Sequence, residues 1–268
     1  MTALLYGATP WLASLGYVLL CFRLKSKALA QGLGMAVIVS HGAALIPAWF
    51  QAESLRFGFA FAMSWMLWLA VVTLWIEAWT QRAGRLMVFV YPVAAIAAVL
   101  PFWFPGVPMA LEASPLFRVH ILMAMLAYSA FFVAAVYAVL MLGQERALHQ
   151  HESPSSLWDE LPPLLALDRL LVRSVGLGFG LLTGTLLSGA LVLSGEGQGW
   201  LRLDHKTVFT LATWVMVALF LLGRVRWGWR GRLASRFTLG GFGLLLLAYI
   251  GTRFVLEVLI GQPLSPQG

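Results

Sequence analysis

The chain has 268 residues, of which 60% are hydrophobic and 11% are charged, and its mean hydropathy is +0.84. Soluble domains are about 45–50% apolar and about 25% charged, so this composition argues against a water-soluble enzyme or a DNA-binding domain. The apolar excess runs along the whole length, which indicates that lipid surrounds the chain. The single cysteine, Cys21, excludes an internal disulfide and a cysteine-based metal cluster.

Eight apolar stretches predict an all-α, polytopic membrane helical bundle of about eight transmembrane helices. A helix needs about 20 apolar residues to cross a bilayer, so eight spans leave only short loops. Residues 1–268 are therefore expected to form a single integral membrane domain. In chain order the spans are expected at 3–22, 31–50, 57–76, 86–104, 117–142, 172–194, 206–223 and 237–260.

The first span, 3–22, is interpreted as a retained helix and not as a signal peptide. Its positive charges, Arg23, Lys25 and Lys27, follow the apolar run, whereas a signal peptide carries them in front. No small-residue cleavage site stands out either. The N-terminus is expected to lie on the outer side of the membrane.

The distribution of basic residues gives an orientation for all eight spans. Cytoplasmic loops carry an excess of Lys and Arg. With the N-terminus outside, thirteen basic residues face the cytoplasm and four face outward, while Arg253 lies within the last span. The thirteen are Arg23, Lys25, Lys27, Arg82, Arg85, Arg146, Arg169, Arg173, Arg224, Arg226, Arg230, Arg232 and Arg236, and the four are Arg56, Arg118, Arg202 and Lys206.

This asymmetry also explains the net charge of +7 and the pI near 10.1. Both are topology signals, so no nucleic-acid partner is expected. The even number of spans puts the C-terminus outside together with the N-terminus. We expect a multi-pass protein of the bacterial inner (plasma) membrane, with the lipid bilayer as its surroundings.

The longest segment between spans contains a predicted amphipathic helix over about 155–171. After Pro162 and Pro163, leucines alternate with Asp168 and Arg169, a pattern typical of a helix lying on the membrane surface. The segment is expected on the cytoplasmic face before span six.

Tryptophans near the ends of spans are expected to anchor them at the membrane interface, where an indole keeps its N–H hydrated and its ring buried. The tryptophans in such places are Trp11, Trp49, Trp79, Trp103, Trp200 and Trp227. Trp200 has a second interpretation, given below.

Three histidines within or beside spans are the main candidates for chemistry, because polar groups in hydrocarbon are costly and mark functional sites. His41 lies in the middle of span two. His120 and His205 lie near the outer ends of spans five and seven. Two imidazoles at similar depth could bind the iron of a haem from opposite faces, although histidines at matching depth do not by themselves form a motif.

Residues around the outer histidines fit the same interpretation. Trp200 could pack on a porphyrin face, and Arg202, Lys206 and Arg118 could pair with propionates. Asp204 could orient His205 or cap the helix that begins there. The alternative is that all of these are ordinary interfacial residues.

Arg253 and Glu257 in the last span are four residues apart and share one helix face. The pair could be an internal clamp, a gate or a ligand contact. It is the only sequence support for a third function, the transport of another solute.

The stretch from Trp200 to Trp229 resembles the tryptophan-rich haem-handling loop and following helix of the CcsA/CcmC/CcmF cytochrome c assembly proteins. In that family the loop reads like W-G-x-x-W-x-W-D-x-K. Trp200, Asp204 and Lys206 match it, and the other tryptophans are missing. The segment GWRGRLA from Gly228 also resembles CcsA.

Further segments extend the resemblance over nearly the whole chain. His120, followed by Tyr128 at the head of a long span, is similar to CcsA. The stretches LPPLLALDRLL, LLTGTLLSG, DHKT, GWRGR and AYIGTRFVLEVL together resemble the YpjD-like branch of the family, which is related to HemX.

The resemblance implies a haem-handling fold with haem binding at His120 and His41, while His205 rests on the chemical argument alone. Two histidines of the CcsA type are missing here, at the places that correspond to about Gly223 and Glu257. A working cytochrome c synthetase also needs a partner of the CcsB type, which the resemblance does not supply.

The leading interpretation is an inner-membrane protein that holds a non-covalent, b-type haem near the periplasmic face. His120 and His205 are expected as ligands, and His41 could receive or relay haem within the bundle. No bond-making chemistry is required, so the chain is not expected to be an enzyme. Partners would be other cytochrome c assembly or haem-biosynthesis proteins. The alternative is a non-catalytic HemX-like regulator or scaffold that has lost haem transfer.

Overall fold

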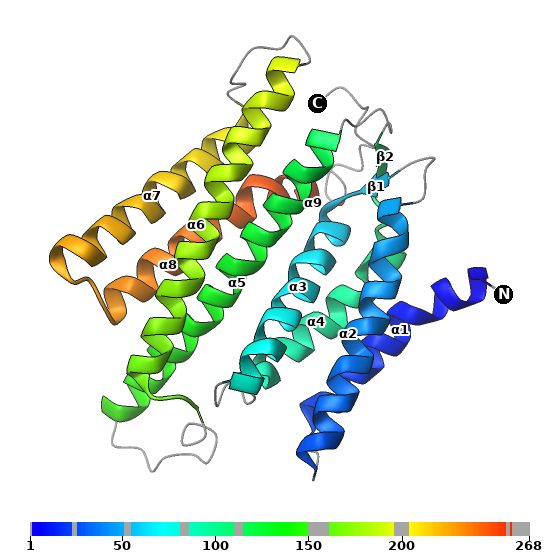
Figure 1. Cartoon of the computed structure of the whole chain (residues 1–268), viewed down its shortest axis with the longest axis horizontal. Helices are drawn as coiled ribbons and strands as arrows, with labels where there is room; N and C mark the ends of the chain where they lie inside the picture. The colour runs from blue at the N-terminus through cyan, green and yellow to red at the C-terminus, as the bar shows by residue number, and fades with distance from the viewer. Residues whose placement is uncertain are drawn as a thin grey trace. The chain divides into compact units, whose positions relative to one another are not determined.

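The computed structural model describes residues 2–22, 26–50, 55–80, 86–109, 115–149, 161–195, 204–255 and 258. Helices dominate, and they match the eight predicted spans in order. Their bounds are α1 Thr2–Cys21, α2 Lys27–Phe50, α3 Phe59–Thr80, α4 Met87–Trp103, α5 Pro115–His149, α6 Leu164–Gly195, α7 His205–Trp227 and α8 Arg232–Leu246. A π-helical turn, Leu247–Gly251, and the short α9, Thr252–Phe254, continue α8 (Figure 1).

Six of the described helices are long and apolar enough to cross a membrane: Ala28–Ile46, Phe59–Trp79, Pro115–Leu148, Leu164–Ser194, His205–Trp227 and Arg232–Phe254. The apolar helices Gly7–Cys21 and Met87–Trp103 are shorter. At 1.5 Å per residue, the 17 residues of α4 extend about 26 Å. The chain is thus a helical membrane protein with several apolar helices, and the sides on which its termini lie remain predictions.

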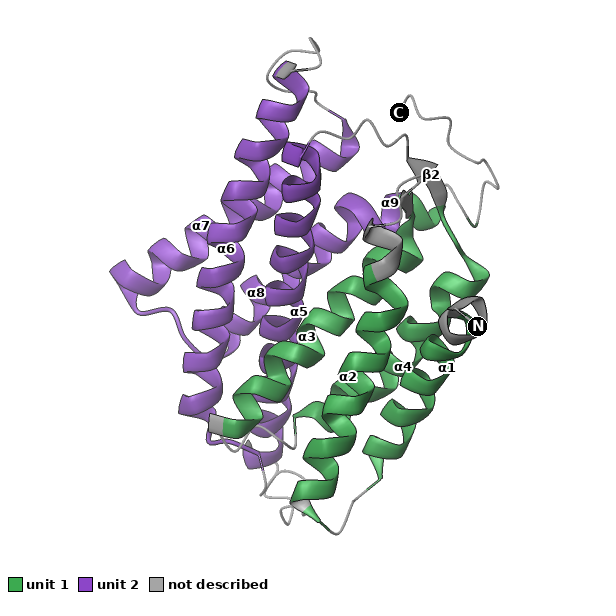
Figure 2. Ribbon diagram, turned by 45° about the vertical axis from the view of Figure 1, so that its right-hand side comes forward, with its two compact units in different colours: residues 1–112, 253–268 green, residues 113–252 purple. Residues whose placement is uncertain are grey.

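The chain divides into two compact units, residues 1–112 with 253–268 and residues 113–252 (Figure 2). In unit 1, α1 packs on α2 and α4, and α3 packs on α4 and α2. In unit 2, α5 runs along α6 and also packs on α8, and α7 packs on α8. The prediction of one integral membrane domain remains a prediction.

A two-stranded antiparallel ribbon is the exception to the helical fold of unit 1. β1, Leu55–Phe57, pairs with β2, Val107–Met109, so that Phe57 is opposite Val107. Gly106 enters β2 with φ +70°, and a Cβ there would lie 2.7 Å from the backbone N of Gly58. Only glycine fits such a conformation at such a close approach.

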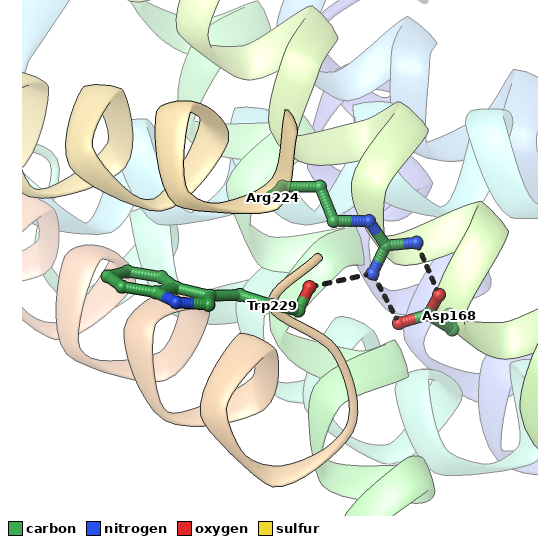
Figure 3. Close-up of polar contacts among 3 residues, drawn as sticks. All are labelled: Asp168, Arg224 and Trp229. Carbon is green, nitrogen blue, oxygen red and sulfur yellow. Dashed lines mark hydrogen bonds and ion pairs between the residues drawn. The ribbon is translucent and has the colours of Figure 1, made fainter. Parts of the chain in front are cut away.

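A buried ion pair joins α6 to α7 in unit 2, and Figure 3 shows its geometry. The guanidinium of Arg224 donates to both oxygens of Asp168, at 3.0 Å and 2.6 Å, and to the carbonyl oxygen of Trp229 at 3.0 Å. Asp168 is 4% exposed. We refer to Asp168, Arg224 and Trp229 as the α6–α7 clamp.

The turn beside the clamp accounts for the two glycines and the tryptophan of the GWRGR stretch. Gly228, with φ +67°, ends α7 in the left-handed conformation, and Gly231, with φ +60°, precedes α8. This turn brings the Trp229 indole against Gly223, where any side chain would collide with the ring. Trp229 also packs on Phe237 of α8, with a distance of 5.1 Å between ring centroids.

The amphipathic segment differs from its prediction. Residues 155–160 lie outside the described part of the chain, and from Leu164 the segment is continuous with α6. No separate surface helix is formed by the described residues 164–171, because the apolar face of this stretch is buried within unit 2, with Leu167 and Leu171 both 0% exposed.

Four of the predicted interfacial tryptophans have described side chains, and all four are exposed: Trp11, Trp79, Trp103 and Trp227. Trp11 and Trp103 also contact each other edge to face, with 5.5 Å between ring centroids. Their exposure agrees with the predicted anchoring at an interface.

Candidate functional site

His41 lies in the core of unit 1 with both ring nitrogens hydrogen-bonded. It is 0% exposed. The Tyr17 hydroxyl lies 3.0 Å from Nδ1 and Ser64 Oγ lies 2.9 Å from Nε2. One nitrogen of a neutral imidazole donates and the other accepts, so this histidine uses its full hydrogen-bonding capacity to join α1, α2 and α3. To bind iron it would first have to break one of these bonds.

His120 lies near the start of α5 in unit 2 and is bonded differently. Its Nδ1 is 3.0 Å from Ser188 Oγ on α6. The ring also hydrogen-bonds to the backbone carbonyl oxygen of Thr185 on α6, and among the described residues no side chain hydrogen-bonds to Nε2. Among the described side chains, Ser188 therefore holds Nδ1 and none occupies Nε2.

The ring of His120 lies against Gly189 of α6, which has no side chain. A Cβ at Gly189 would lie 3.1 Å from His120 Cε1 and 3.5 Å from Nδ1. The Phe117 ring also lies near the imidazole, with 6.4 Å between centroids and 26° between planes. The imidazole therefore neighbours both a glycine and an aromatic ring.

The start of α7 lies at the same end of unit 2 as His120. Lys206, in the first turn of α7, is close enough to His120 to act on it electrostatically. Lys206 Nζ also lies 5.7 Å from the centroid of the Tyr249 ring, in the π-helical turn. A cation that could pair with an acidic ligand therefore lies within electrostatic range of the His120 imidazole.

His205 opens α7 and is exposed. Asp204, for which two roles were expected, is the N-cap: its Oδ1 accepts a hydrogen bond of 2.8 Å from the backbone N of Thr207. A side-chain cap of this kind satisfies one of the free N–H groups at a helix start. The structure brings the start of α7 near His120, and the role of His205 as a second ligand remains a prediction.

The other predicted site residues are divided between described and undescribed parts of the chain. Arg118 lies one helical turn from the start of α5, two positions before His120, and is partly buried. Trp200, Arg202 and Glu257 lie outside the described residues. The roles expected for these residues therefore remain predictions.

Sequence reasoning missed Ser188, Tyr17 and Ser64, the partners of the two buried or partly buried histidines. Serine and tyrosine are common in apolar helices, and no spacing within one helix reveals a contact between distant helices. Asp168 was interpreted as part of an exposed charged face. Its burial could have been suspected only by pairing it with Arg224, a cation near the end of a later span.

Comparison with known proteins agrees with the resemblance noted in the sequence. The family model described as cytochrome C assembly protein matches residues 9–260. The chain is 29% identical over 185 residues to the inner membrane protein YpjD of Escherichia coli, covering 69% of each chain. It is 33% identical over 98 residues to the cytochrome c biogenesis protein CcsA of a Synechococcus strain, covering 37% of this chain and 28% of CcsA.

Another relative is an uncharacterized 28.8 kDa protein of Azospirillum brasilense, 37% identical over 142 residues. The matched part amounts to about half of each of these two chains (53% and 52%). No solved structure matches this chain. With nearly its whole length matched by the family model, the chain belongs to the cytochrome c assembly protein family.

Proposed function

We propose that this protein holds a non-covalent, b-type haem at the end of unit 2 where α5 begins, as part of cytochrome c assembly. The observation that carries the proposal is the state of His120, whose Nδ1 is bonded to Ser188 while no side chain among the described residues bonds to Nε2. Iron-ligating histidines commonly have this pattern of one nitrogen on the metal and the other on an oxygen partner.

The donor set of the described residues fits one axial ligand of a haem. His120 offers a nitrogen at one end of a membrane helix, and Lys206, within electrostatic range of it, supplies a positive charge for a propionate. His205, next to Lys206 in the chain, is the proposed second ligand. His41 does not fit as it stands, because both of its nitrogens are in use.

Within this proposal the protein binds and orients haem and makes no covalent bond. The haem would supply an iron centre that takes axial nitrogen ligands. His120 binds, Phe117 and Gly189 neighbour the imidazole, and Lys206 neutralises acidic charge. We therefore propose a haem-holding protein that is not an enzyme, located in the bacterial inner membrane with this site on the periplasmic face.

The direct test is to purify the full chain in detergent, add haemin and record the absorption spectrum. The expected result is a Soret band that shifts on binding and a titration that saturates. His120→Ala should lose most of the affinity, whereas Arg226→Ala, at an exposed position at the other end of α7, should retain it. A wild-type protein that binds no haemin, or a His120→Ala variant that binds equally well, would contradict the proposal.

A second candidate function is a membrane regulator or scaffold of the HemX-like type without haem transfer. The observation in its favour is that His41 is engaged in packing, which removes one histidine expected to move haem. The c-type cytochrome content of a deletion strain distinguishes the two. Reduced content supports assembly, and normal content with altered tetrapyrrole levels supports regulation.

A further inference from the structure

The hydroxyl of Ser188 lies within hydrogen-bond distance of both the His120 ring and a backbone carbonyl of its own helix. A serine hydroxyl has one hydrogen to donate. Ser188 Oγ donates it to the carbonyl oxygen of Thr185 at 3.1 Å, a bond within α6. The same Oγ lies 3.0 Å from His120 Nδ1. With that hydrogen engaged, the hydroxyl oxygen is left to accept, which makes Nδ1 the N–H donor. The Thr185 carbonyl oxygen, to which the His120 ring also hydrogen-bonds, can likewise only accept.

This assignment leaves the lone pair of the neutral imidazole on Nε2. With the proton fixed on Nδ1, Nε2 is the nitrogen that can bind a metal. An oxygen that accepts from the opposite N–H also raises the basicity of the ligating nitrogen and holds the ring in one orientation. Ser188 therefore has the geometry of a partner that prepares His120 as a ligand.

Gly189, the next residue, determines where the ring can lie. The closest approach of a Cβ to the imidazole, 3.1 Å to Cε1, is tighter than ordinary van der Waals contact. A side chain at position 189 would require the imidazole to shift by a few tenths of an ångström. Since His120 is also held through Nδ1, that shift acts directly on the bond to Ser188.

We propose that Ser188 and Gly189 are the positioning residues of His120: Ser188 selects the tautomer that presents Nε2, and Gly189 leaves the ring its space. The statement about the ligand rests on the proposed function, while the statement about the tautomer does not depend on it. Both residues belong to the LLTGTLLSG stretch, for which the sequence alone suggested no role.

The first experiment measures the tautomer without haem. The full chain, labelled with ¹⁵N in its histidine rings, is studied by NMR in detergent, where protonated and unprotonated ring nitrogens give well-separated signals. His120→Gln identifies the signals of His120. We expect Nδ1–H in the wild type and in Ser188→Thr, which keeps a hydroxyl, and a shift toward the Nε2–H form in Ser188→Ala.

The second experiment measures haemin binding by titration and by the electron paramagnetic resonance spectrum of the ferric complex. Loss of such a partner typically weakens metal affinity about 10- to 100-fold, and we expect a loss of this size for Ser188→Ala together with a changed spectrum. Ser188→Thr should restore both. Gly189→Ala should weaken binding although its neighbouring hydroxyl is intact.

Ser194→Ala is the matched control, because Ser194 lies on the same helix and donates to the carbonyl oxygen of Leu191 at 2.9 Å. It loses the same type of bond without touching His120, so it should resemble the wild type in both experiments. Melting temperatures of all variants in detergent separate a loss of folding from a loss of positioning.

Three results would count against these proposals in different ways. An Nε2–H tautomer in the wild type, or identical ring signals in the wild type and Ser188→Ala, overturns the inference whatever haemin does. Equal haemin affinity in Ser188→Ala and Ser194→Ala overturns its ligand part. A wild type that binds no haemin contradicts the proposed function alone, and the ring signals still decide the tautomer.

Discussion

His41 and His120 both lie in membrane helices, but their hydrogen bonds suit them to different roles, one structural and one chemical. His41 has a partner on each nitrogen, and both partners come from other helices. His120 has one described side-chain partner, Ser188 at Nδ1, and a backbone hydrogen bond to Thr185 on the same helix as that serine. A ligand needs a lone pair and a fixed orientation at the same time, so a histidine with a side-chain partner on one nitrogen only is the better ligand.

At the residue scale we predict that His41 stabilises unit 1 and does not contribute to haemin affinity. His41→Ala leaves the Tyr17 hydroxyl and Ser64 Oγ without their partner in an apolar core. Hydrogen bonds between membrane helices contribute about 0.6–2 kcal/mol each, so losing two should lower the free energy of unfolding by about 1–4 kcal/mol. Unfolding in detergent with increasing denaturant measures this change.

The matched variant is His41→Gln, whose amide can both donate and accept and which should lose less stability. Haemin titration of both variants should give wild-type affinity. A His41→Ala protein that unfolds like the wild type but binds haemin poorly would instead assign a ligand role to His41.

At the scale of the elements, the α6–α7 clamp is the strongest polar link found among the described residues of unit 2. A bidentate bond between a guanidinium and a carboxylate is charge-assisted and geometrically specific. The third bond, to the carbonyl of Trp229, ties the turn between α7 and α8 to the same point. The clamp therefore fixes three helices with one side chain.

We predict that Arg224→Ala strongly destabilises unit 2, because it leaves the carboxylate of Asp168 buried without its cation. Removing one partner of a buried ion pair typically costs about 3–5 kcal/mol. Limited proteolysis and denaturant unfolding of the purified protein measure the loss. Arg226→Ala, two residues farther along α7 and exposed, is the control and should unfold like the wild type.

The double variant Asp168→Leu with Arg224→Met tests the cause of this effect. Replacing a buried ion pair by apolar side chains is often neutral, so the double variant should recover much of the stability lost in Arg224→Ala. If the double variant is as unstable as the single one, the bond to the Trp229 carbonyl carries the stability and the ion pair does not.

Helix lengths illustrate what hydropathy can predict at this scale. The stretch 117–142 was predicted as a span, whereas α5 continues to His149. Similarly, 172–194 was predicted and α6 begins at Leu164. Hydropathy detects the most apolar part of a helix, while helical hydrogen bonding continues through polar residues such as Glu145, which pairs with Arg232 at 2.8 Å.

At the scale of the whole molecule, the sequence predicts more of the fold than of the site. Periodicity is not needed to find a membrane helix, because about 20 apolar residues suffice, and all eight predicted spans correspond to helices. The partners of His41 and His120 could not be predicted, since Tyr17, Ser64 and Ser188 lie 23 to 68 residues away along the chain. Contacts over such distances depend on packing that no local pattern encodes.

The orientation of the molecule provides the last prediction, and it covers both compact units. Thirteen basic residues on one side against four on the other predict that the loop after α1 and the end of α7 share the cytoplasmic side. The end of α6 should then lie outside. In a Cys21→Ser background, single cysteines can be placed at Ser26, Arg226 and Ser194, of which the first is in unit 1 and the others in unit 2.

A thiol reagent that cannot cross membranes should label Ser194→Cys in intact spheroplasts, because the outward side is open to it. Ser26→Cys and Arg226→Cys should be labelled only after the membrane is permeabilised. Labelling of both of these in intact spheroplasts would reverse the orientation and place the His120 end on the cytoplasmic side. Labelling of only one of the two would mean that the number of crossings between them differs from the predicted six, since an even number is required to return the chain to the same side.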